Sequence, residues 1–143
     1  MSTTKDDVQQ EAIRAWVSNR GLGTICLATG LGKTRVGILA MRALPIESIL
    51  VVTPTSNLRD VEWEREILKW DPKIRAKVKI ECINTAYKSL DRSFDLIIFD
   101  EVHESFGPEF IAAHSIPCTY KLGLTATPPD HNEERLAKLT ALC

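Results

Sequence analysis

The chain has 143 residues, the size of one domain, and its 44% apolar and 26% charged residues are typical of ordinary soluble globular proteins. With a formal net charge of −1, the chain lacks the basic surplus that many non-specific DNA-binding proteins carry. We therefore expect its contacts with nucleic acid to be local, and weak when the domain is alone. No apolar run approaches the ~20 residues of a membrane span, and no secretory signal is visible. The four cysteines form no metal or disulfide pattern. We therefore expect one cytoplasmic domain over residues 1–143 with no membrane association.

Short apolar runs alternate with helical patterns along the whole chain. Five runs are predicted to be buried strands, at residues 23–28, 48–53, 77–83, 94–99 and 119–125, and a sixth strand stays open. Helical patterns occupy residues 8–18, 34–43, 57–70, 85–90, 108–113 and 133–142. This alternation indicates an α/β fold with a parallel sheet of at least five strands and helices on both faces.

The first helical stretch has a polar residue on its apolar face. At about 100° per residue, Gln9 falls in the middle of the apolar arc that includes Ala12 and Trp16. An unpaired buried amide costs ~1–3 kcal/mol, so we expect Gln9 either to be satisfied within the core or to bind a ligand.

A glycine-rich segment, ATGLGKT at residues 28–34, lies between the first predicted strand and a helix, as a phosphate-binding P-loop does. Leu27 stands where the P-loop pattern has its first glycine. Glycines let backbone N–H groups approach phosphate oxygens, and the positive end of the helix adds to the anion site. We expect Lys33 to reach the β- and γ-phosphates and the Thr34 hydroxyl to bind Mg²⁺. The predicted nucleotide contacts of this segment are Thr29, Gly30, Leu31, Gly32, Lys33 and Thr34.

The third helical stretch carries two apolar stripes on roughly opposite sides. One stripe consists of Leu58, Val61 and Leu68, and the other consists of Trp63, Ile67 and Trp70. Either both stripes are buried within this domain, or one of them faces a partner or a second lobe.

Two acidic residues follow the apolar part of the fourth predicted strand, in the segment DEVH at residues 100–103. Ligands in open α/β sheets bind at the carboxyl ends of the strands, so these acids are expected to face the same crevice as the P-loop. Asp100 fits the role of a Mg²⁺ ligand, directly or through water, and Glu101 that of the general base or water-positioning group. His103 is a further catalytic candidate, because its position beside the acids lets its ring bond toward the γ-phosphate.

The fifth predicted strand ends in two threonines, Thr125 and Thr127, before a pair of prolines. This places hydroxyl groups at the same edge of the sheet. Taken alone, the segment is only the end of a strand.

With these segments in order, nearly the whole chain resembles the first RecA-like lobe of superfamily 2 helicases and translocases. The residues that carry the resemblance are Gln9, ATGLGKT at 28–34, Thr53 with Pro54, Thr85, DEVH at 100–103, and Thr125 to Thr127. The D-E-x-H form and the helix with Trp63 and Trp70 are most similar to the DEAH-like branch that contains restriction-enzyme motor subunits and fork-remodelling phage helicases. For a phage-encoded protein, the host cytoplasm is the expected location.

The resemblance implies an ATP-dependent helicase that uses ATP and Mg²⁺. It implies that Gln9 reads the adenine edge, and that Lys33, Thr34, Asp100 and Glu101 carry out hydrolysis. The family branch usually has R-x-Y-Q here, whereas this chain has Asp-Asp-Val before Gln9, so the aromatic residue that stacks on adenine is missing.

The resemblance also implies a nucleic-acid partner, single-stranded or forked, with DNA favoured over RNA. Thr53, Pro54 and Thr85 are then expected along the nucleic-acid track, and Thr125 and Thr127 are expected to couple hydrolysis to movement.

The motifs of a second RecA-like lobe, including its arginine fingers, do not occur in these 143 residues. We therefore expect a lobe that binds ATP–Mg²⁺ weakly and hydrolyses it barely without its partner lobe, since an arginine finger contributes about 10³–10⁵ in rate. An alternative is a stand-alone single-lobe regulator or decoy of another helicase. A small P-loop kinase or nucleotide switch is a third hypothesis, which the DEVH and TATP segments disfavour.

Overall fold

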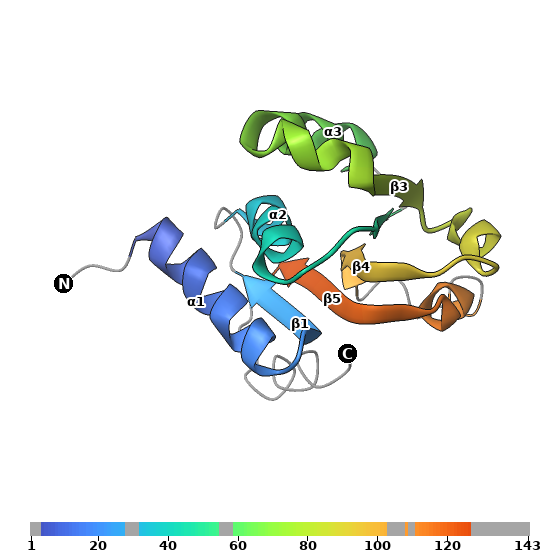
Figure 1. Cartoon of the computed structure of the whole chain (residues 1–143), viewed down its shortest axis with the longest axis horizontal. Coiled ribbons are helices and arrows are strands. Elements are labelled where there is room, and N and C mark those ends of the chain that lie inside the picture. Colours follow the sequence, from blue (N-terminus) through green and yellow to red (C-terminus); the bar gives the residue numbers. More distant parts are fainter. Residues whose placement is uncertain (1–3, 28–31, 55–58, 103–107, 109–110, 127–143) are drawn as a thin grey trace.

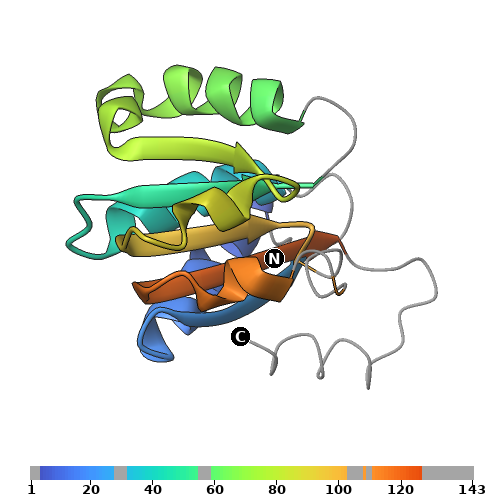
Figure 2. The same cartoon turned by 90° about the vertical axis from the view of Figure 1, so that its right-hand side faces the viewer.

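The computed structural model describes residues 4–27, 32–54, 59–102, 108 and 111–126. Five strands form one sheet, in which all neighbours are parallel and the order is β1-β5-β4-β2-β3 (Figure 2). The strands are β1 Leu22–Leu27, β2 Ile49–Thr53, β3 Val78–Cys82, β4 Phe94–Asp100 and β5 Cys118–Ala126. The predicted α/β fold is confirmed, and each strand end lies within one residue of its predicted bound.

The α-helices in the described part of the chain pack against one face of this sheet (Figure 1). They are α1 Lys5–Ser18, α2 Lys33–Ala43 and α3 Arg59–Trp70. Trp16 of α1, Ile38 of α2 and Ile67 of α3 belong to one buried cluster with Val51 and Leu122 of the sheet. This face is therefore a continuous apolar core beneath the three helices.

Short 3-10 helices cover part of the opposite face. They are η2 Ala86–Ser89 and η4 Ile111–Ser115, and a further one, η1 Pro72–Lys77, follows α3. Ala86 of η2 and Ala113 of η4 pack in a second buried cluster with Leu50 and Phe99. Because the central strands are covered on both faces, they read as unbroken apolar runs in the sequence.

Within the described residues, 3-10 helices stand where α-helical patterns were predicted: η2 lies inside the stretch at 85–90, and η4 overlaps the end of the stretch at 108–113. In η2 the two buried residues are Ala86 and Ser89. Their spacing of three matches the roughly 3.0 residues per turn of a 3-10 helix, and runs longer than about 3–4 residues are uncommon in that geometry.

The first helix begins at Lys5 rather than at the predicted Val8, because a capping box precedes it. The Thr4 hydroxyl accepts a hydrogen bond from the Asp7 N–H at 3.1 Å, and the Asp7 carboxylate accepts one from the Thr4 N–H at 3.2 Å. Both bonds satisfy donors that an isolated helix end leaves unpaired.

The two apolar stripes of α3 have different environments. Trp63 and Ile67 are fully buried, whereas Val61 is 53% exposed and Leu68 is 48% exposed. Trp70, predicted to belong to the same stripe as Trp63, is 45% exposed. Of the alternatives for this helix, the structure therefore supports one buried stripe and one that faces outward.

Several predictions fall on residues outside the described part of the chain. These are the helical stretch at 133–142 and the candidate site residues Thr29, Gly30, Leu31, His103 and Thr127. Within the described residues, no helix combines the length and the apolar character that crossing a membrane requires.

Gly37 in α2 is required by the packing of α3. An added Cβ at this position would lie 2.4 Å from Cη2 of Trp63 and 3.0 Å from its Cζ3. Alanine is normally preferred over glycine inside a helix by about 1 kcal/mol, but here its methyl group overlaps a fully buried ring.

We therefore expect Gly37→Ala to lower the free energy of unfolding by about 1–3 kcal/mol, as overpacked cores do. Urea denaturation measures this change. Arg42→Ala, at an exposed position of the same helix, serves as the control and should shift the free energy by less than about 0.5 kcal/mol. A Gly37→Ala protein more stable than the parent would contradict the packing described.

His114 in η4 gives the fold a dependence on pH. Its ring stacks on Phe99 with the centroids 4.1 Å apart. Burial, together with the positive charge of Lys121, lowers the pKa of His114 from 6.5 to about 4. The folded protein therefore keeps this ring neutral at pH values where the unfolded chain already binds a proton.

Between pH 6.5 and about 4 the unfolded chain binds a proton at His114 that the folded protein does not. The free energy of unfolding therefore falls as the pH decreases through this range. His114→Phe keeps an aromatic ring without the titration. Its unfolding free energy should decline less over this window, by about 1–2 kcal/mol, in urea titrations at matched pH values. Identical pH slopes for the two proteins would show that His114 does not titrate as described.

Candidate functional site

The carboxyl ends of the strands bring the candidate residues to one edge of the sheet. Val52 of β2 pairs in register with Phe99 of β4, and Asp100 pairs with Leu124 of β5. Asp100 thus lies between the ends of β2 and β5. The edge at which parallel strands end is where open α/β sheets bind ligands.

The loop after β1 ends in a glycine that touches α1. Gly32 precedes α2 with a φ of 79°, in the left-handed region that favours glycine. An added Cβ would lie 2.5 Å from Nε2 of Gln9. Gln9 is 4% exposed and lines the same cleft as Lys33. The polar residue predicted to be either a core amide or a ligand contact is therefore packed against the end of the glycine-rich loop.

Lys33, the first residue of α2, meets both acids of the DEVH segment. Its Nζ lies 3.0 Å from Oδ1 of Asp100 and forms a second ion pair with Oε1 of Glu101. Burial lowers the pKa of Lys33, and attraction to Asp100 opposes this shift. The structure therefore brings Lys33 together with the acid pair, although Lys33 and Asp100 are 67 residues apart in the sequence (100 − 33).

Glu101 has an unusual backbone. Its φ is 51°, in the left-handed region, which costs a residue with a Cβ roughly 1–2 kcal/mol. Strained backbone of this kind is concentrated at functional sites. Here it occurs directly after β4, and the carboxylate of Glu101 points back to Lys33.

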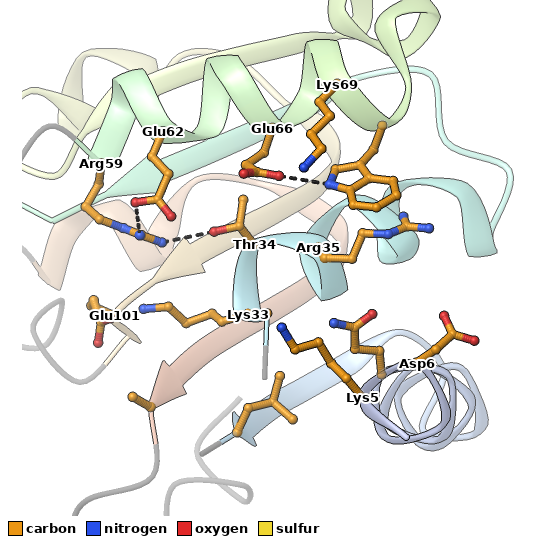
Figure 3. Close-up of a pocket in the computed structure, with 15 residues that line it drawn as sticks. Lys5, Asp6, Lys33, Thr34, Arg35, Arg59, Glu62, Glu66, Lys69 and Glu101 are labelled. Atoms are coloured by element: carbon orange, nitrogen blue, oxygen red, sulfur yellow. Dashed lines mark hydrogen bonds and ion pairs between the residues drawn. The ribbon is translucent and has the colours of Figure 1, made fainter. Parts of the chain in front are cut away.

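Arg59, which was not among the predicted site residues, joins the two candidate magnesium ligands. Its Nη2 donates to the Thr34 hydroxyl at 3.2 Å (Figure 3). Its Nε donates to Oδ2 of Asp100 at 2.7 Å. Its Nη1 bonds the carboxylate of Glu62. A guanidinium group thus occupies the space between Thr34 and Asp100.

A weak signal for Arg59 is present in the sequence. An arginine in the first turn of a helix opposes the positive end of the helix dipole, so its charge needs acidic partners nearby. Glu62, three residues later, is one partner that spacing reveals. Asp100 is distant in the chain, and only the fold brings it within reach.

The carboxylate of Asp100 is fully buried and has donors on one side. Oδ2 accepts from Arg59 and also from the indole Nε1 of Trp63 at 3.0 Å. Oδ1 accepts no hydrogen bond within the described residues, and the Lys33 ammonium is its ionic neighbour. A buried carboxylate oxygen without a hydrogen bond retains the capacity to bind a cation or a donor.

A cleft of about 820 Å³ extends from this cluster along α2 toward the start of α1 and the end of α3. Its size is in the range typical of small-molecule sites. At its far end the guanidinium of Arg35 lies 4.4 Å from the ring centroid of Trp70. Sequence periodicity placed Trp70 in one stripe with Trp63 and Ile67, so it did not indicate this wall of the cleft.

The remaining candidates lie around the same edge of the sheet. Thr53 is 2% exposed and its hydroxyl donates to the Glu81 carbonyl oxygen at 3.5 Å, and Pro54 is also buried. The Thr85 hydroxyl bonds the Glu81 carboxylate, and Thr125 is 2% exposed. The side chains of Thr53 and Thr125 therefore face the protein interior.

Residues 3–85 and 62–130 match the family described as type III restriction enzyme, res subunit. The chain is 35% identical over 136 residues to the DNA 3'-5' translocase XPB2 of Sulfurisphaera tokodaii, covering 85% of this chain and 30% of that protein. It is 31% identical over 144 residues to the DNA 3'-5' helicase XPB of Kineococcus radiotolerans, covering 83% and 25%. It is 32% identical over 126 residues to the putative ATP-dependent RNA helicase QP509L of African swine fever virus, covering 73% and 24%. The chain thus spans 24–30% of the length of these curated relatives.

Proposed function

The chain belongs to the superfamily 2 helicase family described as type III restriction enzyme, res subunit, and we propose that it is the ATP-binding lobe of an ATP-dependent helicase or translocase that acts on nucleic acid. The observation that carries the proposal is the meeting of Lys33 with Asp100 and Glu101 at the carboxyl edge of a parallel sheet. A lysine after a glycine-rich loop and an acid pair at the end of another strand of the same sheet are the parts that position a nucleoside triphosphate.

In this proposal Lys33 binds the β- and γ-phosphates, and its present carboxylate partners hold it at the site until nucleotide arrives. Gly32, at the start of α2, lets backbone N–H groups approach the phosphates. Glu101 orients the attacking water or accepts its proton. Gln9, packed against Gly32, contacts the base.

Mg²⁺ fits between Thr34 and Asp100. The Arg59 guanidinium already places positive charge between these side chains, and Oδ1 of Asp100 accepts no hydrogen bond in the described structure. Oxygen ligands are those that Mg²⁺ prefers in proteins. The bound ion would neutralise charge that develops on the phosphate oxygens.

The nucleic-acid part of the proposal rests on the family and on the names of the relatives. Two relatives are named as acting on DNA and one as an RNA helicase, and we favour DNA for this chain. Thr53, Pro54, Thr85 and Thr125 stay the proposed contacts and coupling residues at the sheet edge. Because Thr53 and Thr125 are buried, we propose that contact there is made by the backbone. A second lobe, carried by other residues, completes the motor.

The first test is nucleotide binding by Lys33→Ala. Loss of the ammonium removes charge-assisted hydrogen bonds to phosphate, each contributing about 1.5–3 kcal/mol, so affinity for ATP–Mg²⁺ should fall by about 10- to 100-fold. Isothermal titration calorimetry measures this change.

Lys73→Ala is the matched control, because Lys73 is an exposed lysine of η1 outside the cleft. It should bind ATP–Mg²⁺ as the parent does. Thermal unfolding establishes that both variants are folded. If folded Lys33→Ala kept the parent affinity, the proposed function would be wrong.

Arg59 provides a test of the magnesium position. The ion has to displace the guanidinium from Thr34 and Asp100, so Arg59→Ala should reduce the Mg²⁺ concentration needed for half-maximal ATP binding, by up to about tenfold. Arg65→Ala, an exposed position on the same helix, should leave this concentration unchanged.

The same variant has a second readout that needs no nucleotide. Without Arg59, Asp100 loses one of its buried partners, so the metal-free protein should melt at a lower temperature than the parent. Mg²⁺ with ATP should restore part of the difference. An unchanged or increased Mg²⁺ requirement would place the ion elsewhere.

A further inference from the structure

The last residue of α3 turns into the cleft instead of the core. Trp70 is 45% exposed, whereas Trp63 on the same helix is fully buried. The indole is held in place by a hydrogen bond from its Nε1 to Oε2 of Glu66 at 2.8 Å. Trp70 therefore presents a flat apolar ring to the cleft, where it does not contribute to the buried core.

The guanidinium of Arg35 lies over this ring. Its Cζ is 4.4 Å from the ring centroid, within the distance of a cation–π contact. Nη1 of Arg35 is buried and has no acceptor among the described residues. The contact with the Trp70 ring therefore holds this guanidinium in place.

The position of Arg35 along the cleft sets what it can contact. Arg35 follows Lys33 and Thr34 directly in α2, so its side chain lines the cleft next to the proposed phosphate site. Figure 3 shows Arg35 between Lys69 at the end of α3 and Lys5 at the start of α1. A ligand whose triphosphate is held at Lys33 would extend its other end past this guanidinium.

We propose that the base of the bound nucleotide stacks on the guanidinium of Arg35, which Trp70 holds flat from behind, with Gln9 at the edge of the base. The proposal rests on the proposed function, because it takes ATP as the ligand. Nucleobases stack on arginine planes as well as on aromatic rings. The arrangement supplies a stacking surface in a chain that has Val8 where the family carries an aromatic residue before Gln9.

The roles of the two residues differ. Arg35 contacts the base, and Trp70 is a positioning residue that acts through Arg35. Lysine at position 35 would keep the charge but lose the planar group, since the ammonium of lysine cannot stack as a guanidinium does. Phenylalanine at position 70 would keep a ring behind the guanidinium, and alanine would not.

The test compares ATP–Mg²⁺ with tripolyphosphate–Mg²⁺, which lacks base and ribose, by isothermal titration calorimetry. Arg35→Lys and Arg35→Ala should bind ATP about 5- to 100-fold more weakly and bind tripolyphosphate within about twofold of the parent. Trp70→Ala should show a smaller loss of the same kind, and Trp70→Phe should recover most of it.

Tryptophan fluorescence gives a readout that is independent of affinity. Trp16 and Trp63 are buried, so Trp70 is the tryptophan among the described residues that acrylamide can reach. ATP–Mg²⁺ should protect the parent protein from acrylamide quenching, and tripolyphosphate–Mg²⁺ should not. The protection should disappear in Trp70→Phe.

The outcomes separate this inference from the proposed function. Lys33→Ala should weaken both ligands, and its failure to do so counts against the nucleotide site as a whole. Equal weakening of ATP and tripolyphosphate by Arg35→Ala would make Arg35 a phosphate contact and overturn the inference alone. Unchanged ATP binding by Arg35→Ala in a folded protein would overturn it as well.

Discussion

The buried carboxylate of Asp100 organises the site, because charged and polar groups from two helices converge on it. Lys33 from α2 and both Arg59 and Trp63 from α3 contact its oxygens, and its side chain is 0% exposed. A carboxylate that has lost its water must be paired, since an isolated buried charge is very unfavourable. The same contacts that make Asp100 tolerable in the fold therefore hold α2 and α3 at the end of β4.

The sequence predicted the parallel sheet and the meeting of Lys33 with Asp100 at its edge. Central strands covered on both faces must be apolar throughout, so their bounds are visible as unbroken runs. Asp100 is recognisable because it is the last residue of an apolar strand, and Lys33 because it follows the first strand after a glycine-rich segment; parallel strands end at one edge. Arg59 and Trp70 come to the site from the first and last residues of α3, and they carry no such marker.

The third helix illustrates why periodicity alone fails there. The spacing of about 100° per residue placed Trp63 and Trp70 in one stripe. A helical wheel assumes that every turn of the helix is covered equally by the neighbouring layer. The sheet underlies Trp63 but Trp70 lies at the cleft, so one is fully buried and the other is 45% exposed. Burial along a helix depends on where the neighbouring layer ends, and this is a property of the tertiary structure.

Trp63 belongs to the core and to the site at once. The far edge of its ring fills the space left by Gly37, while its nitrogen bonds Oδ2 of Asp100. The packing of the interior here therefore cannot change without changing the partners of Asp100. A smaller residue at position 63 would open room for a side chain at 37 but would also remove a donor from the acid, so the two positions are coupled through one indole ring.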